Sequence, residues 1–193
     1  MSLVQPLGAE EAPLPAKPYY ADGDPGPIVG ALAHVPELLE RAMPFLGMIF
    51  GESALPLRTK EIVVLRASAR LECRFCTDTH TVVARDAGLA PQEVAALRGE
   101  APLEAFEHPR ERALIAWVDA VAPGPGVPTP EDSGAIAQQF SEAEIVELTM
   151  LAGATMMLSR LATSLGLPRS EDTVRRLDEE GFQAFAAPSK GAA

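Results

Sequence analysis

Two cysteines and a histidine share one short segment, which reads LECRFCTDTH over residues 71–80. On an α-helix, Cys73, Cys76 and His80 would lie on one face, because residues three or four apart are neighbours there. A cysteine attacks as the thiolate, and an imidazole or a helix N-terminus lowers the pKa of the thiol from about 8.5 to between about 3.5 and 7.5. The second cysteine could then close a disulfide after the first is oxidised. The segment therefore favours thiol redox chemistry.

A carboxylate earlier in the chain, Glu61, could orient His80 and receive protons. On one straight helix Glu61 would lie about 100° from His80 around the axis, at about 3.6 residues per turn. One helix cannot bring the two side chains together. We therefore expect the chain to turn around Leu71 and Glu72, so that the Glu61 segment folds beside the cysteine segment.

Two other interpretations of the cysteine pair stay open at this point. Buried cysteines commonly act as small apolar residues. The pair could also be half of a zinc site, but a structural zinc site needs four ligands. The next candidates, His34 and His108, stand at the starts of separate predicted helices without a paired ligand spacing. We therefore expect no metal and no other cofactor.

The elements that position these residues are predicted to be helices. Their start signals lie at or near Pro36, Pro56, Cys73, Pro91, Pro109 and Ser141, with a last amphipathic piece over 170–182. The first helix is predicted to break or kink at Pro44, and the run from Pro123 to Asp132 is predicted to be a loop. No segment alternates apolar and polar residues with hairpin turn chemistry, so the predicted fold class is all-α. A weak similarity between the segments from Glu61 and from Glu144 suggests helix pairs with a degenerate internal repeat.

The chain has 193 residues, which predicts one domain. Residues 1–27 contain repeated prolines, which remove backbone donors, and are predicted to form an extended arm. Residues 28–180 are predicted to form the helical domain. Residues 181–193 are rich in small side chains and are predicted to form a flexible tail.

The composition excludes several kinds of partner. The chain is 47% hydrophobic but only 5% aromatic, which suits a soluble helical protein. A formal net charge of −11 argues against nucleic acid and anionic membranes, which bind basic surfaces. No secretory signal is visible, and the most apolar window, 42–51, falls short of the roughly 20 residues that cross a bilayer. We therefore expect a cytoplasmic protein, where a CxxC pair is more often catalytic or metal-binding than structural.

The pattern E-x11-C-x2-C-x3-H resembles the signature of AhpD-like alkylhydroperoxidases within the carboxymuconolactone decarboxylase family. The surrounding segments agree with this resemblance: HVPELLERA, LPLRTKEIVVLRAS, HTVVARDAGL and MMLSRLATSLGL. The resemblance implies an all-helical, oligomeric enzyme that reduces peroxides through its cysteine pair and a proton relay. The implied roles are a peroxidatic thiol at Cys76, a resolving thiol at Cys73, a base at His80 and a relay carboxylate at Glu61.

One position departs from the family pattern. The best-known peroxidase members have a second relay histidine immediately before the second cysteine, where this chain has Phe75. This difference leaves the efficiency of the relay and the class of substrate open. The resemblance otherwise implies a hydroperoxide or disulfide small-molecule substrate, a thiol reductant protein, and assembly into a homotrimer or homohexamer.

Two further functions remain as alternatives. The first is a cysteine-independent decarboxylase or lactone-processing enzyme of the same fold, which would use His80 and Glu61 as acid and base. The second is a zinc-bound or purely structural helical assembly module. Replacing both cysteines would leave the first activity intact, and a metal analysis would reveal the second.

Overall fold

The computed structural model describes residues 2–186, and every regular element in that range is a helix. This confirms the all-α fold class. The α-helices are α1 (Pro27–Leu32), α2 (Pro36–Phe50), α3 (Leu57–Arg70), α4 (Arg74–Asp86), α5 (Pro91–Leu97), α6 (Pro109–Val121), α7 (Pro130–Gln139), α8 (Glu142–Leu165) and α9 (Glu171–Glu179). Two 3₁₀-helices, η1 (Leu14–Tyr20) and η2 (Leu103–Ala105), complete the set.

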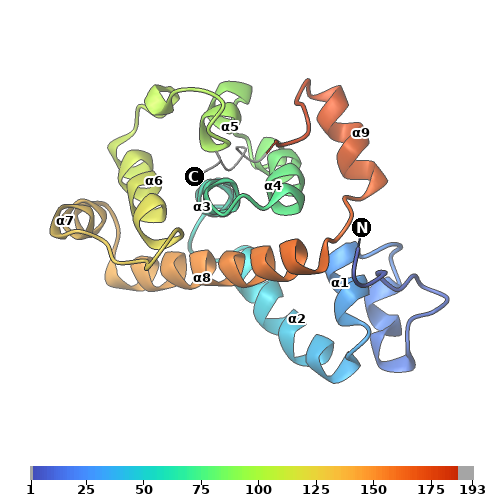
Figure 1. Ribbon diagram of the computed structural model, residues 1–193. Coiled ribbons are helices and arrows are strands. Elements are labelled where there is room, and N and C mark those ends of the chain that lie inside the picture. The colour runs from blue at the N-terminus through green and yellow to red at the C-terminus, as the bar shows by residue number, and fades with distance from the viewer. Residues whose placement is uncertain (1, 187–193) are drawn as a thin grey trace, which may run out of the picture.

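Helix α3 forms the centre of the main core. Figure 1 looks along this helix and shows α4, α5, α6 and α8 arranged around it. Its side chains from residue 60 to residue 68 are buried in every direction around the helix, as expected for a helix enclosed by others. Ile62 and Leu65 have no exposed surface. The side chains of residues 60–68, including Glu61, are therefore packed against neighbouring helices on all sides.

Helix α8 runs along one side of the α3–α6 layer, and α1 and α2 lie on the opposite side of its C-terminal part (Figure 1). Ser141 and Glu144 form the expected capping box at its start, and Gly166 ends it in the left-handed conformation at φ 64°. By length and composition this helix could cross a membrane, with a mean hydropathy of 1.4 over its most apolar window. The prediction from the sequence rested on the window 42–51 alone and did not identify α8 as a helix of this length and hydropathy. In the structure the inner face of α8, including Leu148 and Leu151, is buried against the core.

The N-terminal arm differs from the predicted extended segment. It contains the 3₁₀-helix η1, whose Ala16 and Tyr20 pack with Leu32 and Leu39 in a second, smaller cluster. Its backbone also pairs with the helices, because Leu7 N–H donates to the Gly30 carbonyl at 3.0 Å. Local 3₁₀ bonds and apolar burial thus replace the extended conformation that the prolines suggested.

Three helical details also differ from the sequence prediction. Of the break or kink predicted at Pro44, the break is absent, because α2 continues through Pro44 to Phe50. The predicted loop ends at Thr129, because Thr129 and Asp132 form a capping box that starts α7. Helix α8 is continuous where the similar segment at 61–80 turns between α3 and α4.

The predicted tail is ordered at its beginning. Phe185 is buried, and its N–H donates to Asp78 Oδ1 at 2.8 Å. Residues 181–186 therefore pack against α4. The remainder of the predicted tail, 187–193, lies outside the described residues.

Candidate functional site

The cysteine pair lies at the start of α4. Cys73 is the N-cap residue of this helix, and its sulfur accepts a hydrogen bond from the Cys76 N–H at 3.2 Å. The two residues are joined as a disulfide, with Cα atoms 5.3 Å apart. A helix N-terminus presents free N–H groups and the positive end of the helix dipole, which favour a thiolate over a thiol. The location therefore suits thiol chemistry.

A tight turn between α3 and α4 places the pair. Leu71 caps the C-terminus of α3, and Glu72 has a left-handed backbone with φ of 56°. The Cys73 N–H then returns to the Ser68 carbonyl at 3.0 Å, a hydrogen bond typical of a left-handed helix end. The turn expected around Leu71 and Glu72 is confirmed.

This turn brings Glu61 on α3 against His80 on α4. The Glu61 Oε2 atom lies 2.9 Å from His80 Nδ1. The Glu61 side chain is 7% exposed and the His80 side chain 22% exposed. Phe50 stacks on the imidazole, with ring centroids 6.3 Å apart and planes inclined by 27°. When Nδ1 donates to the carboxylate, the other ring nitrogen of a neutral imidazole is left as a proton acceptor.

Cys76 and His80 line the same cavity, which has a volume of about 230 Å³. The walls are mostly apolar and come from four parts of the chain. They are formed by Pro25, Gly26, Pro27 and Ile28 before and in α1, Phe75 and Thr79 of α4, Leu158 of α8, and Ser170 and Thr173 near α9. The cavity therefore offers one sulfur and one imidazole to a small molecule, within a largely apolar enclosure.

The two sulfur atoms differ in access. Cys76 is 5% exposed and lines the cavity, whereas Cys73 has no exposed surface. A small molecule in the cavity can thus reach Cys76 but not Cys73. Within the described residues, the Cys73 sulfur therefore offers no open surface to a thiol reductant protein.

The structure thus brings together Glu61, His80, Cys73 and Cys76, all of which the spacing had singled out. It also adds residues that the spacing could not identify. Ser159 of α8 places its Oγ 3.5 Å from the Cys76 sulfur. The cavity wall from residues 25–28 was missed as well, because the proline-rich composition of the arm gave no signal of a contact with α4.

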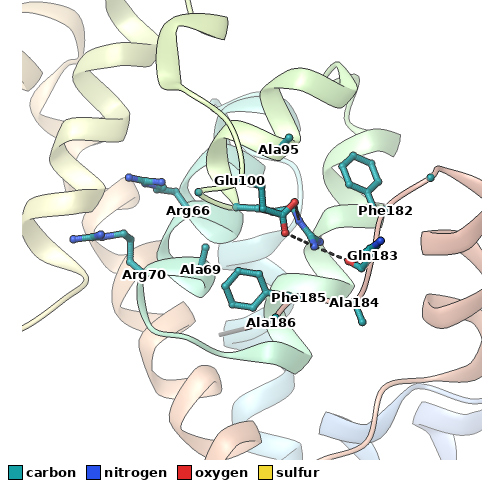
Figure 2. A pocket seen from close by; sticks show the side chains of 13 residues that line it. Arg66, Ala69, Arg70, Ala95, Glu100, Phe182, Gln183, Ala184, Phe185 and Ala186 are labelled. Atoms are coloured by element: carbon teal, nitrogen blue, oxygen red, sulfur yellow. Dashed lines mark hydrogen bonds and ion pairs between the residues drawn. The ribbon is translucent and has the colours of Figure 1, made fainter. Parts of the chain in front are cut away.

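A larger cavity of about 780 Å³ lies elsewhere, between α3, α5 and the segment after α9 (Figure 2). In Figure 2, Arg66 and Arg70 lie on one side and Phe182 and Gln183 on the other. Arg66 makes two hydrogen bonds to Asp119 at 2.7 Å, so its charge is already paired. The cavity is lined by neither cysteine nor histidine. Size alone therefore does not mark the reactive site.

Within residues 2–186, no group of three or more His, Cys, Asp or Glu side chains could hold a metal ion. His34 lies between α1 and α2, where its Nε2 is 2.9 Å from the Gln5 carbonyl. His108 is the N-cap residue of α6.

The chain is similar in sequence to a known protein family and to a curated protein. The model of the carboxymuconolactone decarboxylase family matches residues 36–120, a range that includes Glu61, both cysteines and His80. Among curated proteins, the uncharacterised YdfG of Bacillus subtilis (strain 168) is 23% identical over 116 residues, which cover 60% of this chain and 78% of YdfG.

Solved structures share the fold over most of the chain. The debrominase Bmp8 in complex with 2,3,4-tribromopyrrole superposes with a TM-score of 0.78 at 18% identity, covering 93% of this chain and 98% of Bmp8. The Agrobacterium tumefaciens protein ATU0492, described as a protein of unknown function and a putative antioxidant defence protein AhpD, superposes with a TM-score of 0.65 at 28% identity. That comparison covers 72% of this chain and 94% of the other.

Proposed function

Because the chain belongs to the carboxymuconolactone decarboxylase family and has its AhpD-like fold, we propose that it is a thiol-dependent peroxidase or disulfide oxidoreductase. The observation that carries the proposal is the shared cavity, which Cys76 and His80 both line while Glu61 holds the imidazole. The family match supports an enzyme in general. The peroxidase activity in particular is our inference from the cysteine pair.

In the proposed reaction, the Cys76 thiolate attacks one oxygen of a hydroperoxide. A sulfur–oxygen bond forms, the oxygen–oxygen bond breaks, and the departing alkoxide takes a proton that His80 had received from the thiol. The Cys73 thiol then attacks the sulfenic sulfur, which closes the disulfide and releases water. A dithiol reductant supplies two electrons and two protons to restore both thiols.

The cavity favours small apolar substrates. Phe75 lines it where related peroxidases have a second relay histidine, and its other walls include Ile28 and Leu158. A hydrocarbon substituent would leave no buried polar group unpaired against these walls. We therefore propose small organic hydroperoxides as the substrate class, reduced through a relay of one histidine and one glutamate.

The test is a titration of free thiols in the fully reduced protein, which has two cysteines per chain. One equivalent of tert-butyl hydroperoxide should remove both thiols, and a dithiol reductant should restore them. The matched control is the Cys73→Ser/Cys76→Ser variant, which should not consume the hydroperoxide. Thiols that persist in the wild-type protein, or equal consumption by the control, would contradict the proposal.

Reductive debromination is a second candidate, favoured by the extent of the similarity to Bmp8. The superposition covers 93% of this chain, so it must include most of the segments that line the cavity. In such a reaction the dithiol would supply two electrons, a carbon–bromine bond would break, and carbon would receive a proton in place of bromide. Release of bromide from a brominated pyrrole such as 2,3,4-tribromopyrrole by the reduced protein would favour this candidate, and its absence would exclude it.

A further inference from the structure

The hydroxyl group of Ser159 contacts the sulfur that lines the cavity. Ser159 lies on α8, far from α4 in the sequence, and is 2% exposed. Its Oγ is 3.5 Å from Cys76 Sγ, a hydrogen-bond distance for sulfur, with the hydroxyl as donor. The contact is therefore made by tertiary packing, inside the protein and out of contact with bulk water.

This hydroxyl differs from three other helical hydroxyls of the chain, and also from the buried hydroxyls of Ser68 and Thr77, which have no hydrogen-bond partner among the described residues. Serine and threonine in helices commonly donate to the carbonyl four residues earlier. Thr149 and Thr155 on the same helix do so, at 2.7 and 2.9 Å, and Thr81 on α4 does so at 2.8 Å. Ser159 instead directs its hydrogen bond to Cys76. The local geometry of the helix does not require this choice, so a tertiary role is the better explanation.

Each sulfur of the pair consequently has a donor of its own. Cys73 Sγ accepts from the Cys76 N–H, and Cys76 Sγ accepts from Ser159. A thiolate buried to this degree is costly unless donors surround it, and a hydrogen bond to a charged acceptor is stronger than one to a neutral acceptor. The Ser159 hydroxyl would therefore bind the thiolate of Cys76 more strongly than its thiol.

We propose that Ser159 is a positioning residue that holds the Cys76 sulfur toward the cavity and stabilises its thiolate. The inference deepens the proposed function, since it concerns the nucleophile of that reaction. It nevertheless describes a property of Cys76 alone, which can be measured without any peroxide. A chain that fails to reduce hydroperoxides would still reveal whether Ser159 acts on this sulfur.

The experiment uses the Cys73→Ser background, in which Cys76 is the only thiol. The rate of alkylation by iodoacetamide is followed across the neutral and alkaline pH range, and its midpoint reports the thiolate. Adding Ser159→Ala should raise this midpoint by about one pH unit and slow alkylation about tenfold below it, as expected for one lost charge-assisted hydrogen bond. Ser164→Ala, at an exposed position of the same helix, should leave the midpoint unchanged.

A second pair of variants separates the hydrogen bond from packing. Thr and Val have nearly the same shape, so Ser159→Thr and Ser159→Val differ mainly in the hydroxyl group. The Thr variant should keep the midpoint near that of Ser159, and the Val variant should follow the Ala variant. Equal midpoints in the Thr and Val variants, or an unchanged midpoint in the Ala variant, would overturn the proposal.

Discussion

Two effects act on the cysteine pair in opposite directions. Cys73 is the N-cap of α4, and the positive end of a helix dipole contributes about 0.3–1 kcal/mol, or up to about 2 kcal/mol when partly buried. Cys76 instead shares the cavity with His80, and an imidazole that accepts the thiol proton changes the nucleophile outright. The accessibility of the two sulfurs decides which cysteine attacks, because Cys73 has no exposed surface. We therefore assign the attack to Cys76.

The assignment predicts a difference between the two single variants. After treatment with a hydroperoxide, Cys73→Ser should accumulate sulfenic acid at Cys76, because no second thiol can resolve it. Cys76→Ser should react slowly, because its one remaining thiol, at Cys73, is buried. Trapping with a dimedone probe followed by mass spectrometry measures both outcomes. Faster labelling of the Cys76→Ser variant would transfer the attacking role to Cys73.

The contact between Glu61 and His80 predicts a separate effect on rate. Glu61→Gln keeps the shape of the side chain but removes the charge that fixes the Nδ1 proton. The second-order rate of thiol oxidation should fall by about tenfold, the lower end of what outer-shell partners of a histidine contribute. His80→Ala should lower it by about a hundredfold, as expected for loss of a general base.

A matched substitution controls for the loss of one negative charge. Glu107 is exposed and lies outside the cavity, so Glu107→Gln should retain the wild-type rate of oxidation. A Glu61→Gln variant that oxidises as fast as this control would show that His80 does not depend on the carboxylate.

At the scale of the helices, the sequence predicted the positions of the cysteines, His80 and Glu61 better than it predicted the helices and side chains that surround them. The signals that position the catalytic candidates are local: a helix start at Cys73, and a carboxylate at Glu61 that could reach His80 only if the chain turned after α3. The unpredicted parts depend on tertiary contact. Pro44 does not break α2, whose inner residues Leu39 and Leu46 are buried on either side of it, and packing offsets the lost hydrogen bond. The Ser159 contact likewise has no local signature.

The start of α7 was predicted wrongly for a different reason. The run TPED over 129–132 carries a threonine and an aspartate three residues apart, which is a capping-box signature. Proline-rich residues just before it suggested a loop, and the loop prediction was extended too far. The capping box could have been predicted from the sequence, but the proline- and glycine-rich residues before it favoured a loop.

The turn between α3 and α4 predicts an effect on stability. Glu72 adopts a φ of 56°, a conformation that costs most residues about 1–2 kcal/mol and glycine very little. Glu72→Gly should therefore raise the free energy of unfolding by about 0.5–1 kcal/mol, after the greater chain entropy of glycine is subtracted. Urea denaturation measures the difference. Glu72→Gln removes the charge but keeps the conformational cost, so a similar gain in that variant would contradict the explanation.

A buried lysine links three helices and predicts a dependence of stability on pH. Lys60 is 1% exposed, and its Nζ donates to the Ile49 and Gly51 carbonyls at 3.0 and 2.7 Å and lies 2.8 Å from Glu147. The hydrogen bond from Lys60, followed by one from Ser53, lowers the pKa of Glu147 below its usual value of 4.5. A carboxylate with a lowered folded-state pKa stabilises the protein above the unfolded-state pKa. This contribution is lost as the pH falls through the folded-state value.

The free energy of unfolding should therefore decline as the pH falls below about 4.5, and Lys60→Met should flatten this decline. The same variant should cost about 2 kcal/mol at neutral pH, because two carbonyls and a carboxylate lose their donor. Glu142→Gln, exposed on the same helix as Glu147, should leave the acid dependence in place. An equally steep decline in Lys60→Met would show that another group controls it.

At the scale of the whole molecule, the cavity is assembled from segments far apart in the chain. The arm pairs with α1 at Gly30, where a side chain would meet Pro6 and the Leu7 backbone at 3.2 Å or less. Leu3 N–H also donates to the Leu165 carbonyl at the end of α8. These contacts hold the arm beside α8 and α1, and thereby place Pro25 and Ile28 over Cys76. The reactive sulfur is thus enclosed by the first and the last thirds of the chain.

The outer face of α8 is apolar and exposed. Val146, Met150 and Met157 are 64%, 49% and 50% exposed, and their spacing places them on one side of the helix with Gly153. A row of exposed apolar side chains on a long helix is typical of a contact between subunits. We therefore predict a homo-oligomer, a trimer or a hexamer, in which a second copy of the chain covers this face.

Light scattering should give a mass that is a multiple of 20.4 kDa, and a mass equal to one chain would refute the prediction. Met150→Glu should shift the distribution toward single chains, because a charge on this face would lose its hydration on assembly without gaining a partner. Val127 provides the control, since it is 74% exposed but lies in the loop before α7. Val127→Glu should leave the mass unchanged, and an equal shift in both variants would place the subunit contact somewhere other than α8.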